Sequence, residues 1–451
     1  MSRNRRLAEI FLPKGLPKGV RTCYVAIYAI VAVYSVAMIA TAHIIVGYDT
    51  ASYYAAIDNL LAGRPDLWRT PVYPLILALC RSGGQALGGG GEAWAVVQTA
   101  QWVVLFLAIP AFRLAAARVI GPHPKAVLLA TAVFALHPAL LSYPDRMLTE
   151  SFSISFSAFF VASFLKGVTE NRSASMWRAM GWLTVLVMLR PVFVCYLPVA
   201  AVAIVIYGVQ CRHTCRRALR AAVAGFLLCV GVCAGYVAAM HRTYGIHSLT
   251  IVSSVNNYYL FWPKGMVVAE SATSPEVAEA IRRNVKPPIG ENYEDVCLAG
   301  WEDEMAFLRE ISPVSFESYI NTMMKRHRDV VAEEAVARLT QKSWSYHLSS
   351  RDFVTKRLGF KLPAIFSIAA GLLFLTITSL CLAVLWIRRR RVNVGVFITT
   401  GLPLVLMIST LIGAQSDYHR LFIPALPLFY LLGIYCAQRV WTRFKLNQQL
   451  P

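Results

Sequence analysis

The sequence contains few charged residues, and acidic residues are the scarcest of them. Only 15% of the 451 residues are Asp, Glu, Lys or Arg, with 24 acids against 44 bases, whereas 57% are hydrophobic. Soluble domains are about 25% charged and about 45–50% apolar. This scarcity of charge excludes a soluble enzyme, a disordered basic protein and a DNA-binding domain, whose basic charge lies on a polar background. The composition predicts an all-α polytopic membrane protein.

Signals typical of several other protein classes are also missing. The sequence has no internal repeat, coiled-coil heptad run or low-complexity tract. The glycine run at 88–91 lacks the Lys-Ser/Thr of a phosphate-binding P-loop. The ten cysteines lie mostly in apolar runs or beside basic flanks and indicate no disulfide framework. Cys211 and Cys215 lie among arginines, which disfavour a bound metal cation.

Long apolar runs fill most of the chain and predict about ten transmembrane helices. A spanning helix needs about 20 largely apolar residues. The candidate runs are 23–46, 94–112, 126–141, 151–165, 179–189, 192–208, 221–240, 362–387, 392–413 and 421–438. The predicted organisation is a basic tail (1–22), an N-terminal transmembrane module (23–240) with an outer loop (47–92), an outer region (241–361), C-terminal transmembrane helices (362–438) and a second tail (439–451).

Basic residues gather in alternate connections between these runs. The segments 1–22, 113–125, 166–178, 209–220, 388–391 and 439–451 carry 23 of the 44 bases but only two of the 24 acids. Because loops rich in Lys and Arg stay on the cytoplasmic side, we expect these segments and both termini there. The net charge of +20 is then a topology signal, and no polyanionic partner is needed to explain it.

The ten apolar runs contain no Asp, Glu, Lys or Arg in their cores. Ion-coupled transporters usually carry ionisable groups near the membrane midplane, so this absence counts against such a transporter. The charged residues lie at the outer edge instead. In the outer region, Ser274-Pro275 and Ser312-Pro313 predict helix starts, and we expect that region to be mostly helical.

The outer loop 47–92 begins with a predicted amphipathic helix. Asp49 or Thr50 can cap its N-terminus, and Gly63 is suited to end it. Tyr53, Tyr54, Ile57, Leu60 and Leu61 share one helical face. This pattern is typical of a short helix that lies in the membrane interface, with its tyrosines at headgroup depth.

The order of motifs in this chain resembles that of the GT-C membrane glycosyltransferases. The greatest similarity is to the dolichyl-phosphate-mannose protein mannosyltransferase and aminoarabinose-transferase group (glycosyltransferase family 39/83). The resemblance rests on Asp49 after the first span, the Tyr53-Tyr54 pair, Gly63, the segment 69–75 (RTPVYPL), the segment 143–150 (YPDRMLTE), Arg190-Pro191, and the segment 418–427 (YHRLFIPALP). It covers residues 20–210 and, more loosely, 310–438.

The resemblance implies transfer of a sugar from a polyprenyl-phosphate carrier to an acceptor, with inversion at the anomeric carbon. In that reaction, Asp49 is the expected base, and Glu150 is a second candidate for a catalytic, acceptor-binding or metal role. The expected substrate-binding residues are Tyr53, Tyr54, Arg69, Tyr73, Asp145, Arg146, Arg190, Tyr259, Lys264, His419 and Arg420. Many relatives carry two adjacent acids where this chain has Asp49-Thr50, so a divalent metal is left open.

Each of these residues also has a plain structural explanation. Asp49 can be a helix cap, Glu150 can favour a helix dipole, and Asp145 can be a solvated loop residue. The arginines can extend to lipid headgroups. Tyr258, Tyr259 and Trp262 can form a sugar-stacking surface or an interfacial aromatic belt. The alternative functions are a flippase or transporter for lipid-linked glycans and an assembly partner without catalytic activity.

The expected partners are a polyprenyl-phosphate-linked donor, a lipid, glycan or protein acceptor, and the bilayer, without nucleic acid. The expected location is the bacterial cytoplasmic membrane, with the active site on its outer face. The sugar, the acceptor, the carrier length and the oligomeric state are not specified by the sequence.

Overall fold

All regular secondary structure in the described part of the chain is helical, and the helices form a bundle. The computed structural model describes residues 11–13, 15–41, 44–46, 48–86, 94–210, 216–286, 304–340, 393–413 and 422–448. In these ranges the only pairing of extended backbone is an isolated bridge between Ile45 and Arg146. The predicted all-α class is therefore confirmed for the described chain.

Seven helical segments of the described chain are long and apolar enough to cross a membrane, and the chain is accordingly a multi-pass membrane protein. Two of them begin with a 3-10 turn, η1 (Pro191–Cys195) before α10 and η5 (Ile423–Ala425) before α22. The seven segments contain α2 (Lys18–Ala40), α5 (Trp94–Ile120), α8 (Glu150–Glu170), α10 (Tyr196–Gln210), α11 (Arg216–Tyr244), α20 (Val394–Gly413) and α22 (Leu426–Gln448).

The structure does not confirm a count of about ten spans. Two of the predicted runs form helices below the length of a full span, α6 (Pro124–Leu136) with 13 residues and α9 (Ser173–Leu189) with 17. The α6 helix stops at His137, because Pro138 follows and starts the short helix α7 (Pro138–Leu141). The predicted run 362–387 lies outside the described residues.

The predicted charge-free interior needs one correction. The helix α5 continues to Ile120, so Arg113 lies within it instead of in a loop, and its side chain is buried. The guanidinium faces the ring of Tyr24 on α2, 5.9 Å from the ring centroid. A cation can be buried there because aromatic faces attract it.

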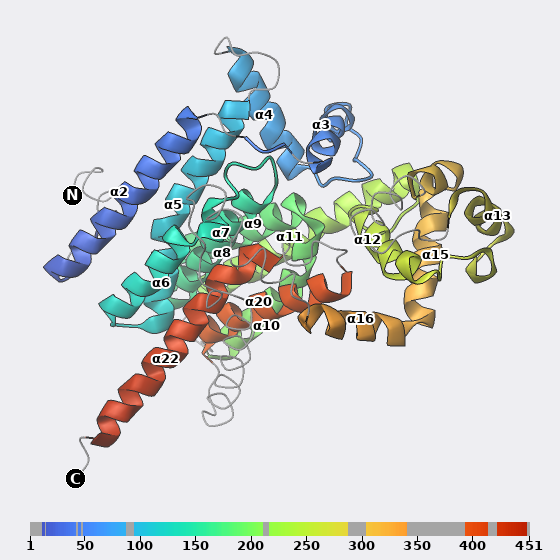
Figure 1. The fold of residues 1–451 in the computed structure, drawn as a ribbon. Coiled ribbons are helices and arrows are strands. Elements are labelled where there is room, and N and C mark those ends of the chain that lie inside the picture. Colours follow the sequence, from blue (N-terminus) through green and yellow to red (C-terminus); the bar gives the residue numbers. More distant parts are fainter. Residues whose placement is uncertain are drawn as a thin grey trace.

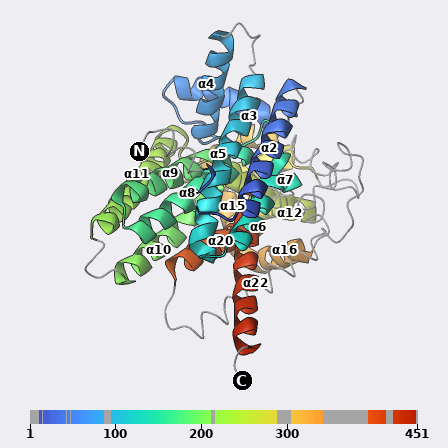
Figure 2. The same ribbon diagram turned by 90° about the vertical axis from the view of Figure 1, so that its left-hand side faces the viewer.

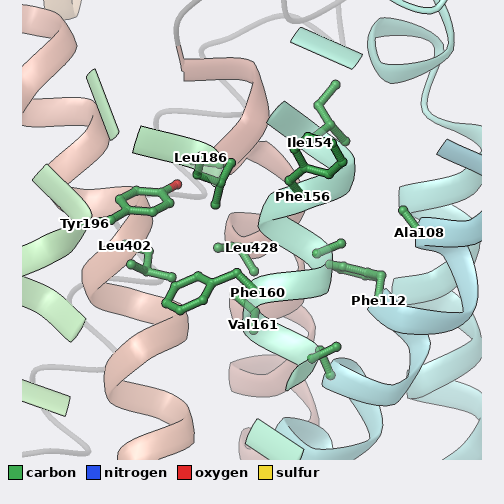
Figure 3. Close-up of a cluster of buried hydrophobic side chains, with 14 of the residues drawn as sticks. Ala108, Phe112, Ile154, Phe156, Phe160, Val161, Leu186, Tyr196, Leu402 and Leu428 are labelled. Atoms are coloured by element: carbon green, nitrogen blue, oxygen red, sulfur yellow. The ribbon is translucent and has the colours of Figure 1, made fainter. Parts of the chain in front are cut away.

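The core of the bundle is built around α8. Fifteen of its 21 residues are buried, and it contacts α5 and α9 most extensively. Figure 3 shows apolar side chains of neighbouring helices gathered against α8, where Phe160 and Val161 lie at the centre of the view. The neighbours in this view contribute Ala108, Phe112, Leu186, Tyr196, Leu402 and Leu428.

Two helices of the first outer loop lie together at one end of this bundle. They are α3 (Tyr48–Leu61) and α4 (Val72–Ala86), and the C-terminal end of α22 lies at the opposite end (Figures 1 and 2). The predicted stop at Gly63 is confirmed: its φ is +72°, and the bonds Gly63 N–H to Leu60 O and Arg64 N–H to Asn59 O form a Schellman cap.

The outer region has a hydrophobic core of its own, formed by residues between Met240 and Met323. Figure 1 shows its helices grouped on the right of the bundle. Both predicted Ser-Pro starts are confirmed, since Ser274 and Ser312 each accept a hydrogen bond from a first-turn amide. The elements are α12 (Val252–Phe261), η2 (Trp262–Lys264), η3 (Ala269–Ser271), α13 (Pro275–Asn284), α15 (Pro313–Arg326) and α16 (Arg328–Thr340), with helical residues also at 304–310.

Candidate active site

The two acid-bearing outer segments of the N-terminal half are joined by backbone hydrogen bonds. Ile45, just before α3, donates from its amide to the carbonyl of Asp145 (2.8 Å), and Met147 donates to the carbonyl of Ile45 (3.1 Å). The Thr50 hydroxyl also donates to the carbonyl of Met147 (3.4 Å). The start of α3 and the segment 142–149 therefore form one structural unit, although about 100 residues of chain separate them.

A buried polar cluster fixes the second segment to α5. The carboxylate of Asp145, which is fully buried, accepts hydrogen bonds from Gln98 Nε2 (2.9 Å) and Trp102 Nε1 (3.0 Å). Gln101 Nε2 donates to the carbonyls of Pro144 and Arg146. Buried polar groups are stable only when they are hydrogen-bonded. The geometry therefore favours a structural role for Asp145 over the predicted contact with a substrate.

Asp49 forms an ion pair with Arg69. The helix α3 begins at Tyr48, so Asp49 lies in its first turn, and its Oδ1 is 2.6 Å from Arg69 Nη2. The same guanidinium donates from Nε to the Ser52 hydroxyl (2.8 Å) and lies over the ring of Tyr53, 4.3 Å from its centroid. The Asp49 side chain is 29% exposed and that of Arg69 is 17% exposed. The pair is thus partly open to the surroundings.

Glu150 and Arg190 form a second, deeply buried ion pair. Their Oε1 and Nη1 atoms are 3.0 Å apart, and the two side chains are only 1% and 9% exposed. Glu150 is the first residue of α8, and Arg190 follows the last residue of α9, which packs against α8. Pro191 holds Arg190 in an extended conformation and ends α9 there. The sequence break at Arg190-Pro191 thus places a guanidinium beside the start of α8.

Aromatic side chains connect the two ion pairs. Tyr53, which lies under Arg69, meets Tyr73 edge to face with their ring centroids 4.7 Å apart. Tyr73 in turn contacts Phe152. Burial, with smaller contributions from neighbours that include Glu150, raises the pKa of the Tyr73 hydroxyl. Tyr73 is fully buried, and its hydroxyl makes no hydrogen bond within the described chain. The Tyr73 ring therefore lies between Tyr53, which contacts Arg69, and Phe152, which lies two residues after Glu150.

Two other predicted residues lie around this centre. Arg146 Cζ is 5.5 Å from the ring centroid of Tyr143, and its Nε has no hydrogen-bond partner in the described ranges. Tyr54 contacts Trp94 at the start of α5, with ring centroids 5.4 Å apart. Both are predicted substrate ligands, and both remain predictions. His419 and Arg420 lie outside the described residues.

The predicted aromatic surface of the outer region is not exposed. Tyr258, Tyr259 and Trp262 are 0%, 4% and 2% exposed and belong to the core of that region. Tyr259 lies near Glu304, whose burial raises its pKa to about 8. Neither sugar stacking nor an aromatic belt fits these positions, because neighbouring helices cover the rings. Lys264 forms an ion pair with Glu334 of α16 (3.1 Å).

Several residues that build this site are not among those predicted from the sequence. Gln98 and Gln101 were missed because only formal charges were sought within the spans, although buried amides there also need partners. Asp66 accepts hydrogen bonds from the amides of Trp68 and Arg69 and was missed as well. A Pro-Asp turn signal precedes Arg69 and would have indicated it.

No metal-binding cluster is evident in the described part of the chain. No group of three or more His, Cys, Asp or Glu side chains there is placed to hold a metal ion. Asp49 and Glu150 each contact an arginine instead.

Comparisons with known proteins yield similarity to solved structures alone. No family model and no curated protein matches the chain. The apo crystal structure of the Archaeoglobus fulgidus oligosaccharyltransferase matches with a TM-score of 0.49 and 13% identity. The same organism's oligosaccharyltransferase AglB, in complex with an inhibitory peptide and a dolichol-phosphate, matches with a TM-score of 0.43 and 12% identity. Each match covers 94% of this chain and 51% of the other, so the chain spans about half the length of these proteins. Similarity at this level is too weak to assign a function.

Proposed function

We propose that the protein is an integral membrane glycosyltransferase of the GT-C type. In this proposal it moves a sugar from a polyprenyl-phosphate-linked donor to a lipid, glycan or protein acceptor, with inversion. The observation that carries the proposal is the pairing of two acids with two arginines, Asp49 with Arg69 and Glu150 with Arg190, at one end of an apolar helix bundle. The motif order that resembles family 39/83, which includes these four residues, supports it as well.

The chemistry of the proposed step requires a base and a cationic site on opposite faces of the sugar. The acceptor hydroxyl attacks the anomeric carbon, and its proton passes to the carboxylate of Asp49. The bond between that carbon and the phosphate oxygen breaks, and the bonding electrons leave with the lipid phosphate. Arginines stabilise the departing anion because each guanidinium can donate two parallel hydrogen bonds. Attack from the face opposite the leaving group inverts the anomeric carbon.

In this mechanism Arg69 exchanges its partner when the donor binds. The lipid phosphate takes the guanidinium of Arg69, and the Asp49 carboxylate then becomes available to the acceptor hydroxyl. The partial exposure of this pair suits such an exchange better than the near-complete burial of Glu150 and Arg190 does. Arg146 supplies a further cation, since its Nε has no hydrogen-bond partner in the described ranges. Glu150 and Arg190 then position Tyr73 and the start of α8.

The proposal includes the placement of the protein. Both termini lie in the cytoplasm, and the site faces the outer side of a bacterial cytoplasmic membrane, as the distribution of basic residues predicts. The helix α3 lies in the membrane interface, where a polyprenyl phosphate presents its headgroup. The outer region 241–361 caps the site and contributes to acceptor choice.

The proposed base is tested by the substitution Asp49→Asn. The full-length protein is incubated in proteoliposomes with a panel of radiolabelled polyprenyl-phosphate sugars and a membrane extract that supplies acceptors. We expect the parent to label a lipid, glycan or protein fraction and Asp49→Asn to lose about 10²–10⁴-fold in rate, the usual contribution of a general base. Asp58→Asn is the matched control, because Asp58 lies on the same helix with its side chain exposed.

Two results contradict the proposal in different ways. If a folded Asp49→Asn variant transfers sugar at the parental rate, Asp49 is not the base. If the parent labels no fraction with any donor, the enzyme itself is in question. Movement of the intact lipid-linked sugar across the vesicle membrane would then favour a flippase.

A further inference from the structure

The loop between α3 and α4 contains a buried carboxylate that contacts no substrate in the proposed mechanism. Asp66 is 5% exposed. Its Oδ1 accepts the backbone amides of Trp68 (2.9 Å) and Arg69 (2.8 Å), and its Oδ2 accepts Nδ2 of Asn59 on α3 (2.9 Å). Asp66 thus joins the last turns of α3 to the backbone of Arg69.

These bonds close a ring that fixes the direction of the Arg69 side chain. An aspartate that binds the amides two and three residues ahead forms a tight local turn. From that turn the Arg69 side chain reaches back to Asp49 and Ser52 in the first turns of the same helix. The helix is therefore linked to Arg69 at both ends, through Asn59 and Asp66 at one end and through Asp49 at the other.

The same loop is held on its far side by hydrogen bonds to backbone carbonyls, which do not use the Asp66 carboxylate. Tyr236 and Tyr244 of α11 donate from their hydroxyls to the carbonyls of Arg69 (3.3 Å) and Pro65 (3.0 Å). The amide of Ile251 donates to the carbonyl of Leu67 (2.9 Å). Loss of the Asp66 carboxylate therefore leaves the loop attached to α11 and the outer region. What it removes is the turn that aims the guanidinium.

We propose that Asp66 is a positioning residue that aims Arg69 at the phosphate of the lipid donor. This inference rests on the proposed function, because Arg69 is the arginine that exchanges Asp49 for phosphate there. Misplacement of a binding group by about 1 Å can cost on the order of a hundredfold in an enzyme. Asp66 acts through Arg69, so its effect disappears when the Arg69 guanidinium is absent.

The test measures binding of undecaprenyl monophosphate to the full-length protein in nanodiscs by native mass spectrometry. Four variants are compared with the parent: Asp66→Ala, Asp66→Asn, Arg69→Ala and the double variant of Asp66→Ala with Arg69→Ala. Asp58→Ala is the matched control on the exposed side of α3. Hydrogen exchange of the 65–71 peptide is recorded for each protein, because it reports the turn without any ligand.

We expect Asp66→Ala to weaken binding by between about ten- and a hundredfold and to speed exchange in the 65–71 peptide. Asp66→Asn keeps an acceptor oxygen for the two amides, so it should stay within about threefold of the parent. In the Arg69→Ala background, Asp66→Ala should have no further effect on binding. If Asp66 had only a structural role, the loss of binding caused by Asp66→Ala would add to the loss caused by Arg69→Ala. The melting temperature would then fall, but the effects of the two substitutions on binding would not be coupled.

The outcomes separate this inference from the proposed function. If Arg69→Ala binds the lipid phosphate as the parent does, the phosphate role of Arg69 is wrong, and with it the basis of the inference. If Arg69→Ala weakens binding but Asp66→Ala does not, the proposed function stands and the positioning role of Asp66 is wrong. Unchanged exchange in the 65–71 peptide of Asp66→Ala also overturns that role.

Discussion

At the scale of single residues, the charges near the outer end of the bundle form pairs of unequal burial. The pair of Asp49 and Arg69 is partly exposed, whereas that of Glu150 and Arg190 is almost completely buried. A buried charge requires a close partner, because transfer from water costs several kcal/mol per ion. The exposed pair can exchange partners at a low cost, and the buried pair cannot. The two pairs are therefore suited to different tasks, ligand exchange and fixed geometry.

This difference predicts the effect of the substitution Arg190→Met. The variant leaves the Glu150 carboxylate buried without its arginine, which costs about 3–5 kcal/mol for a buried pair. The double substitution of Glu150→Gln with Arg190→Met should recover much of that loss. Thermal unfolding in detergent measures the stability of the single and the double variant. The control is Arg172→Met, because the Arg172–Glu170 pair is exposed and such pairs contribute about 0–1 kcal/mol. Equal melting shifts for the two single variants would contradict the prediction.

At the scale of elements, signals local to the chain predicted the helix ends well. The stop at Gly63, the break at Arg190-Pro191 and the starts at Ser274 and Ser312 are all found. Each depends on the φ of one residue or on a cap within four residues. Such short-range geometry is readable in the sequence. The acids and arginines of the site came instead from the resemblance of the motif order to that of the GT-C glycosyltransferases.

Contacts between distant segments were beyond the reach of this reasoning. The pairing of Asp49 with Arg69 depends on the turn made by Asp66, and that of Glu150 with Arg190 depends on how α8 packs against α9. The burial of Tyr259 likewise depends on the helices that cover it. An aromatic run has the same pattern on a surface and in a small core, so the sequence could not distinguish them.

The packing of α9 against α11 depends on a close approach at Gly225. A Cβ placed there would lie 2.9 Å from Cβ and Cγ of Met180 on α9. Membrane helices approach closely where a residue is small, so Gly225→Ala should destabilise the protein by about 1–3 kcal/mol. Gly235→Ala is the control on the same helix, since its Cβ meets nothing within 4 Å. That change should be neutral or stabilise the helix by up to about 1 kcal/mol. Thermal unfolding compares them, and equal melting temperatures would contradict the assigned contact.

At the scale of the whole molecule, the protein has two hydrophobic cores with different chemistry. The larger core fills the membrane bundle and is built mainly from apolar side chains. The smaller core of the outer region encloses a carboxyl group, Glu304, which is fully buried. Because this carboxyl group is buried, the stability of the outer region should depend on pH.

The direction of this dependence follows from the pKa of Glu304. Burial raises that pKa from 4.5 to about 8. The folded outer region therefore keeps a proton that the unfolded chain loses above pH 4.5, and its stability falls as the pH rises from about 4.5 to about 8. The slope within this window is about 1.4 kcal/mol per pH unit.

The substitution Glu304→Gln should abolish this slope, since an amide keeps the neutral form at every pH. Hydrogen exchange of α15, corrected for the intrinsic pH dependence of exchange, measures the stability of the smaller core between pH 5 and 9. Glu310→Gln is the control, because Glu310 lies in an exposed pair with Arg283 on the surface of the same region. If the stability of the parent and of Glu304→Gln changes equally with pH, the Glu304 carboxyl group does not keep its proton in the folded outer region. If the bundle helices lose protection together with α15, the two cores unfold as one unit.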